Sequence, residues 1–248
     1  FALPAARPGW VGRGAVVGTR FLVQVDGGAQ PHRSLKDVVG ILDGGGLPEG
    51  VRSRAVKVFE ALARAEGAAH GVPSDEVHFH EVGANDSIVD IVGACVALEL
   101  LGVERVYCSP ITVGNGTVKC AHGTLPVPAP ATALLLKGAK TAPSEIQAEA
   151  TTPTAPAILT ELGESFGPLP AMEVAEVGCG AGTREHGPMP NVVRVFVGQA
   201  SSDGRADTVI ELSANIDDCP GEVLGATIEA LMAGGCLDAW AAPIYMKK

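Results

Sequence analysis

The chain has 248 residues, of which 46% are hydrophobic and 19% charged, so a packed core is expected and disorder is not. Its net charge of -10 and its lack of any Lys/Arg run argue against a nucleic-acid binder, which needs a basic surface to displace counterions from phosphates. The same charge disfavours an anionic membrane surface, and no apolar run reaches the ~18–20 residues that span a bilayer.

The first half of the chain predicts helices joined to short strands. Residues 20–25 alternate like a strand, and "SLKDVVGILDG" (34–44) is typical of a helix that starts at a serine cap. Residues 51–71 repeat apolar side chains at helical spacing and predict an amphipathic helix. Residues 77–82 and 105–113 are strand-like. They flank a helix at 87–102, giving a β-α-β-like unit.

The helix expected at 87–102 is apolar nearly all round, which predicts burial. Ser87 and Asp90 fit a capping box at its start, and Gly102 stands where a glycine closes a helix.

Two glycine-rich loops and two more helices follow. The first loop holds Gly114, Gly116 and Gly123, and proline-opened helices are expected at 127–138 and 151–163. The second loop, "GCGAGTREHGPMPN" (178–191), resembles a nucleotide fingerprint but leads into a strand at 192–198. A Rossmann loop leads into a helix, so we interpret it as a turn.

The chain as a whole predicts an α/β (α+β) protein with two domains. A large first domain covers 1–199, the polar stretch 200–207 is a linker, and 208–248 opens a second α+β domain. That second part predicts a strand (208–216), a helix (221–235) and a strand (237–246). The chain starts at Phe1 rather than Met, and its last strand has no partner after it. We therefore expect a piece of a longer protein, with the second domain truncated.

The six cysteines are spread along the chain without a C-x-x-C pair, so a disulfide scaffold is not indicated. We expect reduced thiols and a cytoplasmic location, and the first ten residues lack the apolar core of a secretion signal.

The stretch "VHFHEVGANDSIVD" (77–90) gathers metal-capable side chains more densely than the rest of the chain. In a strand, His78 and His80 point to the same side, so their imidazoles can share a Zn, Ni, Cu or Fe ion. Glu81 joins them if the chain turns at Gly83. The alternative is that the acids cap the next helix and the histidines bond to backbone.

The stretch "GNGTVKCAHGTLPVPAP" (114–130) is a candidate anion site. Backbone amides of the Gly114 and Gly116 loop attract phosphate or carboxylate, and Lys119 adds a positive charge. Cys120 and His122 are soft-metal ligand types. The alternative is an ordinary tight turn.

The stretch "NIDDCPGE" (215–222) holds Asp217 and Asp218 at the end of an expected strand. Paired carboxylates there suit Mg²⁺ or Mn²⁺ carrying a nucleoside triphosphate. Acids ahead of a helix also favour its dipole, and the residues alone leave these two interpretations equal.

Several long, ordered segments together resemble the LarC family of nickel-insertion proteins. They are "HFHEVGANDSIVDIVGACVALELLG", "SPITVGNGTVKCAHGTLPVPAPATALLLKG", "GCGAGT" with "PNVVRV", "NIDDCPGEVLG" and "LDAWAAPIYMKK". With "HRSLKDV" the resemblance covers roughly residues 31–248. The family's opening strand and its glycine segment have no counterpart in this chain.

The resemblance implies a CTP-dependent nickel chelatase of the lyase class. It would insert Ni²⁺ into pyridinium-3,5-bisthiocarboxylic acid mononucleotide, cleaving CTP to CMP and pyrophosphate with Mg²⁺ or Mn²⁺. The expected metal ligands are His78, His80, Glu81 and His122.

In the same interpretation, Gly114, Gly116 and Lys119 hold the substrate's anionic groups, and Asp217 with Asp218 positions the CTP metal. Lys119, Asp217 and Asp218 are the expected catalytic residues. A non-catalytic nickel carrier and a nucleotide-dependent phosphohydrolase remain alternatives, and the sequence allows a homo-oligomer.

Overall fold

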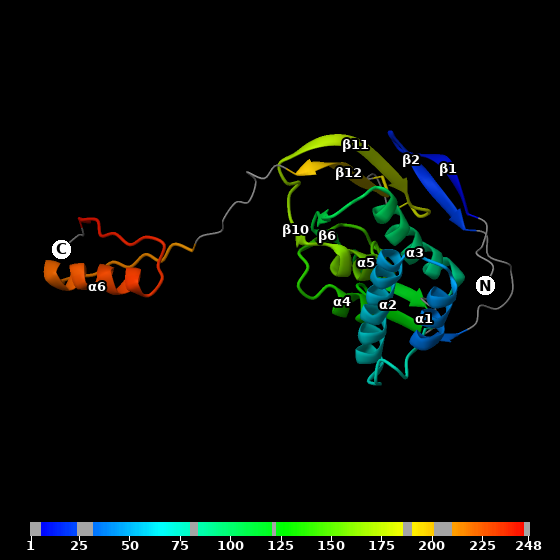
Figure 1. Ribbon diagram of the computed structural model, residues 1–248, viewed down its shortest axis with the longest axis horizontal. Helices are drawn as coiled ribbons and strands as arrows, with labels where there is room; N and C mark the ends of the chain where they lie inside the picture. The colour runs from blue at the N-terminus through cyan, green and yellow to red at the C-terminus, as the bar shows by residue number, and fades with distance from the viewer. Residues whose placement is uncertain are drawn as a thin grey trace. The chain divides into compact units, whose positions relative to one another are not determined.

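The computed structural model describes residues 6–23, 32–79, 84–120, 123–185, 190–200 and 210–245. It divides into two compact units, residues 1–204 and 205–248 (Figure 1). The expected mixture of helices and strands is confirmed. The helices of the first unit are α1 (Leu35–Gly44), α2 (Glu49–His70), α3 (Asn85–Leu100), α4 (Pro130–Leu135) and α5 (Thr154–Leu162). Its strands are β1 (Ala6–Arg13), β2 (Val16–Val23), β3 (Arg33–Ser34), β4 (His78–Phe79), β5 (Tyr107–Cys108), β6 (Ile111–Thr112), β7 (Thr117–Cys120), β8 (Gly123–Pro126), β9 (Thr141–Ala142), β10 (Ser165–Phe166), β11 (Met172–Ala181) and β12 (Val192–Ala200).

Helix α2 is the centre of the hydrophobic core, because α1, α3, α4 and α5 all pack against it. The predicted amphipathic face is confirmed. Its buried side chains include Val51, Ala55, Val58, Phe59 and Leu62. The helix ends at Gly71, whose positive φ of 72° suits glycine.

Helix α1 begins at Ser34, as its sequence predicts. The Ser34 hydroxyl accepts a hydrogen bond from the backbone N–H of Asp37, and an Asp37 carboxylate oxygen accepts one from the Ser34 N–H at 2.8 Å. This reciprocal capping box satisfies two backbone groups that the first turn of a helix leaves open.

Helix α3 differs from its prediction at both its start and its surface. It begins at Asn85 with Ala84 as the cap residue, so the predicted capping box of Ser87 and Asp90 is wrong. Both residues lie inside the helix. Burial on all sides is also wrong, because Leu100 is 83% exposed. The predicted closing glycine is confirmed, since Gly102 follows the helix with a φ of 63°.

The segment 105–113, which was expected to form one strand, is interrupted in the structure. It forms two pieces, β5 and β6, on either side of Pro110, which has no N–H for a ladder. Strand β6 pairs in parallel with β9 through the α4 connection, and β5 pairs in parallel with β10. Within each of these two pairs, the carboxyl ends of the strands lie toward one edge and their amino ends toward the other.

A separate four-stranded sheet has the order β1-β2-β11-β12. Its strands β1 and β2 form an antiparallel hairpin, as do β11 and β12, and β2 runs parallel to β11 (Figure 1). The interpretation of "GCGAGT" as a turn is wrong, because residues 178–181 lie in β11. The predicted strand at 192–198 is confirmed as β12.

The second unit contains the predicted helix as α6 (Gly221–Ala233). The strands predicted at 208–216 and 237–246 are wrong, because the described residues of both segments form no strand. No side chain of α6 is buried. Throughout the described ranges, we find no helix that combines the length and the apolar character needed to cross a membrane.

Candidate functional site

His78 lies on the exposed side of β4, beside the start of α1. Strand β4 pairs antiparallel with β3, which places His78 opposite Ser34. The next residue, Phe79, is 2% exposed, and its ring centroid lies 6.3 Å from that of Phe59. Because side chains alternate along a strand, this buried ring turns the His78 imidazole outward. The other expected metal ligands, His80, Glu81 and His122, lie outside the described residues.

Three elements lie around His78, namely β3 and the starts of α1 and α3. A guanidinium N–H of Arg33 donates to the Asn85 side-chain oxygen at 2.8 Å, which ties β3 to the start of α3. Hydrogen bonds from Ser34 hold the pKa of Asp37 below its ordinary value of 3.8, and the charge of His78 makes a smaller contribution in the same direction. The starts of α1 and α3 therefore converge near β4. Sequence reasoning missed the Arg33–Asn85 contact and the place of Asp37, because no local pattern reports a contact between residues 52 positions apart.

Two carboxylates follow in the first turns of α3. Desolvation raises the pKa of Asp90, and the negative charge of Asp86 raises it further. The two acids are four residues apart, so they share one side of the helix. Their mutual repulsion is of the kind that a bound cation relieves. Within the described ranges, however, no three His, Cys, Asp or Glu side chains form a metal-binding group. The metal site stays a prediction.

The predicted anion loop follows β6 and is packed against residues 142–150. Gly114 is buried, and a Cβ at this position would lie 1.7 Å from the Ala148 carbonyl oxygen. The Gly116 carbonyl accepts a hydrogen bond from the Val127 N–H at 3.0 Å, and Gly116 itself has a φ of 85°. Packing therefore requires glycine at position 114, and the left-handed backbone conformation favours it at position 116. Their role in anion binding stays a prediction.

The same loop is fastened to the segment before α5. Thr151 donates its hydroxyl to the Thr112 carbonyl at 2.7 Å, and Ser144 donates to the Val113 carbonyl at 2.9 Å. The carboxyl ends of β6 and β9 are thus held to the start of α5. Ligands of open α/β sheets bind outside the carboxyl ends of the strands. Gly114 and Gly116 lie at this edge.

Lys119 lies in β7, in a hairpin that follows the glycine loop. It pairs with Thr124 of β8 and its side chain is exposed, whereas the neighbouring Cys120 is half-buried. The Cys120 thiol contacts the Gly123 carbonyl oxygen at 3.6 Å. Lys119 is therefore free of the core and able to reach an anionic ligand.

Asp217 and Asp218 lie just before α6 in the second unit, and both are exposed. The Asp218 backbone N–H donates to an Asp217 carboxylate oxygen at 3.1 Å, and Asp218 has a positive φ of 54°. A non-glycine residue in that region is uncommon and marks a constrained turn. The pair stays a predicted site for a divalent ion.

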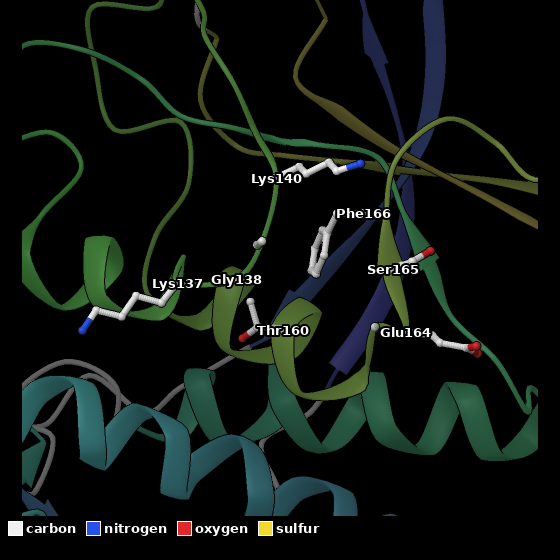
Figure 2. A pocket seen from close by; sticks show the side chains of 9 residues that line it. Lys137, Gly138, Lys140, Thr160, Glu164, Ser165 and Phe166 are labelled. Carbon is white, nitrogen blue, oxygen red and sulfur yellow. The ribbon is translucent and has the colours of Figure 1, made fainter. Parts of the chain in front are cut away.

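A cavity of about 330 Å³ lies at the opposite edge of the parallel strands, next to Lys140 and Phe166 (Figure 2). Figure 2 shows the Phe166 ring and the Lys140 side chain beside the cavity, while Glu164 points away from it. The Arg105 guanidinium donates to both carboxylate oxygens of Glu164, so the negative charge of Glu164 is paired outside the cavity. The cavity is next to the amino ends of β9 and β10, and none of the described residues that line it is a predicted site residue.

Comparison with known proteins decides the family. The family model described as "Nickel insertion protein" matches residues 9–248. The chain belongs to the nickel insertion protein family. The resemblance drawn from the sequence is confirmed, and the family match includes the segments around His78, Lys119 and Asp217.

Curated relatives of this nickel insertion family agree. The chain is 47% identical over 236 residues to a putative nickel insertion protein of Geobacter metallireducens, covering 95% of this chain and 60% of that protein. It is 42% identical over 246 residues to one of Synechococcus elongatus, covering 95% and 61%. A Staphylococcus epidermidis protein named pyridinium-3,5-bisthiocarboxylic acid mononucleotide nickel insertion protein is 44% identical over 220 residues, covering 89% and 55%.

The chain spans about three-fifths of the length of the curated nickel insertion proteins that it matches. No solved structure matches it.

Proposed function

We propose that this chain takes part in inserting Ni²⁺ into pyridinium-3,5-bisthiocarboxylic acid mononucleotide, in a CTP-dependent reaction of the lyase class. The family match over residues 9–248 carries the proposal. The name of the Staphylococcus epidermidis relative supplies the substrate. The reaction completes a nickel-pincer nucleotide cofactor and takes place in the cytoplasm, where six free thiols are stable.

The incoming Ni²⁺ is a substrate held first by His78, His80, Glu81 and His122. Imidazole nitrogen is a suitable ligand for Ni²⁺, and the exposed side of β4 presents His78 to solvent. Asp86 and Asp90 make the nearby start of α3 negative, which attracts a dication. The sulfurs of the thiocarboxylates are softer ligands than imidazole and draw the metal onward to the organic substrate.

The anionic groups of the organic substrate lie against the loop after β6. The positive charge of Lys119 attracts the substrate phosphate or its thiocarboxylates. The backbone at Gly114 and Gly116 lets these anionic groups come close to its N–H groups. The support for this role is the position of the loop at the carboxyl edge of β6 and β9.

Asp217 and Asp218 would hold the Mg²⁺ or Mn²⁺ ion that accompanies CTP. Carboxylate oxygens are ligands that these hard cations prefer, and both side chains are exposed. Such an ion would supply neutralisation of the triphosphate charge for the cleavage of CTP to CMP and pyrophosphate.

The first experiment is a calorimetric titration of Ni²⁺ into the chain and into a His78→Ala/His80→Ala variant. His70→Ala is the matched control, because His70 is a solvent-exposed histidine on α2. We expect near one equivalent of Ni²⁺ for the chain and the control, and a loss of binding in the double variant. Equal binding in all three proteins would refute the proposed ligands.

The nucleotide role is tested in a full-length version of the protein. We expect Asp217→Asn with Asp218→Asn to abolish CTP cleavage, and unchanged turnover would remove these residues from the mechanism. Nickel binding without any nucleotide binding would favour a carrier protein. Nucleotide cleavage that needs no nickel and survives loss of both histidines would favour a phosphohydrolase.

A further inference from the structure

Strand β3 is two residues long, and both of its residues hold other elements in place. Arg33 pairs through its backbone with Phe79 of β4, and Ser34 pairs with His78. Ser34 also begins α1, where it forms the capping box with Asp37. The strand therefore fixes β4 and the start of α1 next to each other.

The Arg33 side chain adds a third element to this junction. Its Nη2 group donates to the Asn85 side-chain oxygen at 2.8 Å, and this contact is partly buried. A guanidinium donates from a rigid, planar group, so its hydrogen bond fixes direction as well as distance. Arg33 thus holds β4 with its backbone and the start of α3 with its side chain.

Asn85 does not cap the helix that it begins. The cap residue of α3 is Ala84, and no side-chain hydrogen bond caps this helix end. Asparagine is a weak helix former that is favoured at caps, where its side chain bonds to the backbone. The described contact of its side-chain oxygen is instead with Arg33, which lies 52 positions earlier in the chain.

Two side chains that the proposed function uses lie directly beside the residues that Arg33 holds. His78 precedes Phe79, and Asp86 follows Asn85. Both His78 on β4 and Asp86 in the first turn of α3 are exposed. The place of the imidazole relative to the acidic start of α3 therefore depends on the two contacts of Arg33.

The acids at the start of α3 remain available to a cation. Among the described residues, neither Asp86 nor Asp90 has a partner in an ion pair. The Arg33 guanidinium is positively charged, but its described hydrogen bond goes to the neutral amide of Asn85. Arg33 therefore holds the helix without neutralising these carboxylates.

The hydrophobic core holds β4 and α3 from their buried sides. Phe79 of β4 and Ile88 of α3 are each 2% exposed and belong to one buried cluster. These side chains supply stability, whereas the Arg33 contact lies at the partly buried rim. Loss of the Arg33 contact should therefore leave the chain folded and alter the placement of the exposed groups.

We infer that Arg33 is a positioning residue for Ni²⁺ capture, because its contacts with β4 and Asn85 keep the His78 imidazole beside the acidic start of α3. This role rests on the proposed function, in which His78 is a nickel ligand. Residues that orient a metal ligand without touching the metal matter nearly as much as the ligand. Their loss weakens metal binding by about 10- to 100-fold.

The charge of Arg33 gives positioning and electrostatics opposite signs. A nearby positive charge repels Ni²⁺, so removing the charge by itself tightens binding. Loss of a positioning contact weakens binding instead. Lys36 is the matched control for charge, because it is an exposed cation in the first turn of α1, two residues beyond Ser34.

The test is a calorimetric titration of Ni²⁺ into the chain, Arg33→Met, Asn85→Ala and the double variant. Methionine has a long unbranched stem without an N–H donor, and alanine favours a helix. We expect each single variant to bind Ni²⁺ about 10-fold more weakly than the chain. The double variant should be no weaker than either single variant, because all three lack the same contact. Lys36→Met should bind at least as tightly as the chain.

A conservative variant separates the contact from a general need for asparagine. Asn85→Asp keeps an acceptor oxygen for Arg33, so it should bind Ni²⁺ at least as tightly as the chain. Thermal unfolding followed by circular dichroism identifies the folded variants. If Arg33→Met does not fold, Asn85→Ala and Asn85→Asp decide the outcome, because both retain Arg33.

The outcomes separate this inference from the proposed function. Unchanged or tighter binding in either folded single variant, or weaker binding in Asn85→Asp, overturns the role of Arg33 and leaves the proposed function standing. Binding that is unaffected by His78→Ala, or a chain that binds no Ni²⁺, overturns the proposed ligand and the role of Arg33 with it.

Discussion

The sharpest quantitative prediction concerns Phe79, which fixes β4 to the core. Its ring is 2% exposed and lies against Phe59, which is 0% exposed, with the two ring planes inclined at 57°. Removing a buried aromatic ring costs about 3–5 kcal/mol, because transfer energy is lost and a cavity remains. We expect Phe79→Ala to lower the free energy of unfolding by about 4 kcal/mol.

Urea denaturation followed by far-ultraviolet circular dichroism measures this loss, since α1 to α5 dominate the helical signal. Leu100→Ala is the control, and it should change stability by less than about 0.5 kcal/mol because that side chain is 83% exposed. The double variant with Phe59→Ala isolates the ring contact, which should contribute about 0.5–1.5 kcal/mol of coupling. A loss below about 1 kcal/mol for Phe79→Ala would refute the account of how β4, and with it His78, is anchored.

Three further predictions follow from single residues. Gly114→Ala should destabilise the chain or shift the 142–150 segment, because its Cβ would lie 1.7 Å from the Ala148 carbonyl oxygen; an unchanged thermal midpoint would contradict this packing. The pKa of Asp37 is lowered in the folded state, so its contribution to stability is present above its ordinary value of 3.8 and is lost as the pH falls through the folded pKa. Asp37→Asn should therefore flatten acid unfolding in that range, and an unaltered acid profile would count against the cap. Burial raises the pKa of Cys95 to about 11, so roughly 0.1% of it is thiolate at pH 8, and a thiol reagent should label exposed Cys236 long before Cys95; equal labelling would contradict the burial.

The sequence predicted those helices whose signals are local. The cap at Ser34 and the apolar face of α2 depend on residues three or four positions apart, and both are confirmed. The start of α3 was misplaced because Ser87 and Asp90 match a capping pattern while the chain already turns helical at Asn85. A pattern that fits two registers cannot choose between them without the tertiary contact of Arg33 with Asn85.

Strands were harder to predict than helices, because a strand pairs with segments that are far away in the sequence. Residues 178–181 carry glycines that are typical of a turn, yet pairing with β12 and with β2 holds them extended. The apolar pattern of residues 208–216 predicts a strand, but the described part of this segment, residues 210–216, is exposed and forms no strand. Strand formation depends on such pairing, which propensity alone does not report.

The candidate site was predictable in residue type but not in its assembly. His78 is exposed and Phe79 is buried, which is the alternation expected of a strand, and the role of His78 as a metal ligand stays a prediction. The packing of Gly114 against Ala148 and the neighbourhood of Asp37 depend on chain segments that meet only in the fold.

Because β2 pairs with β11, the four-stranded sheet can be completed only after β11 has been synthesised. Thr19 meets Gly180, and Arg13 donates to the Gly182 carbonyl at 2.8 Å, so the N-terminal hairpin has no lasting neighbour until about 160 more residues have followed. The helical contacts around α2 are largely closer in sequence and form earlier. During that interval the open edge of β2 offers unpaired backbone to any strand nearby. Synthesis of β11 supplies the strand that closes this edge.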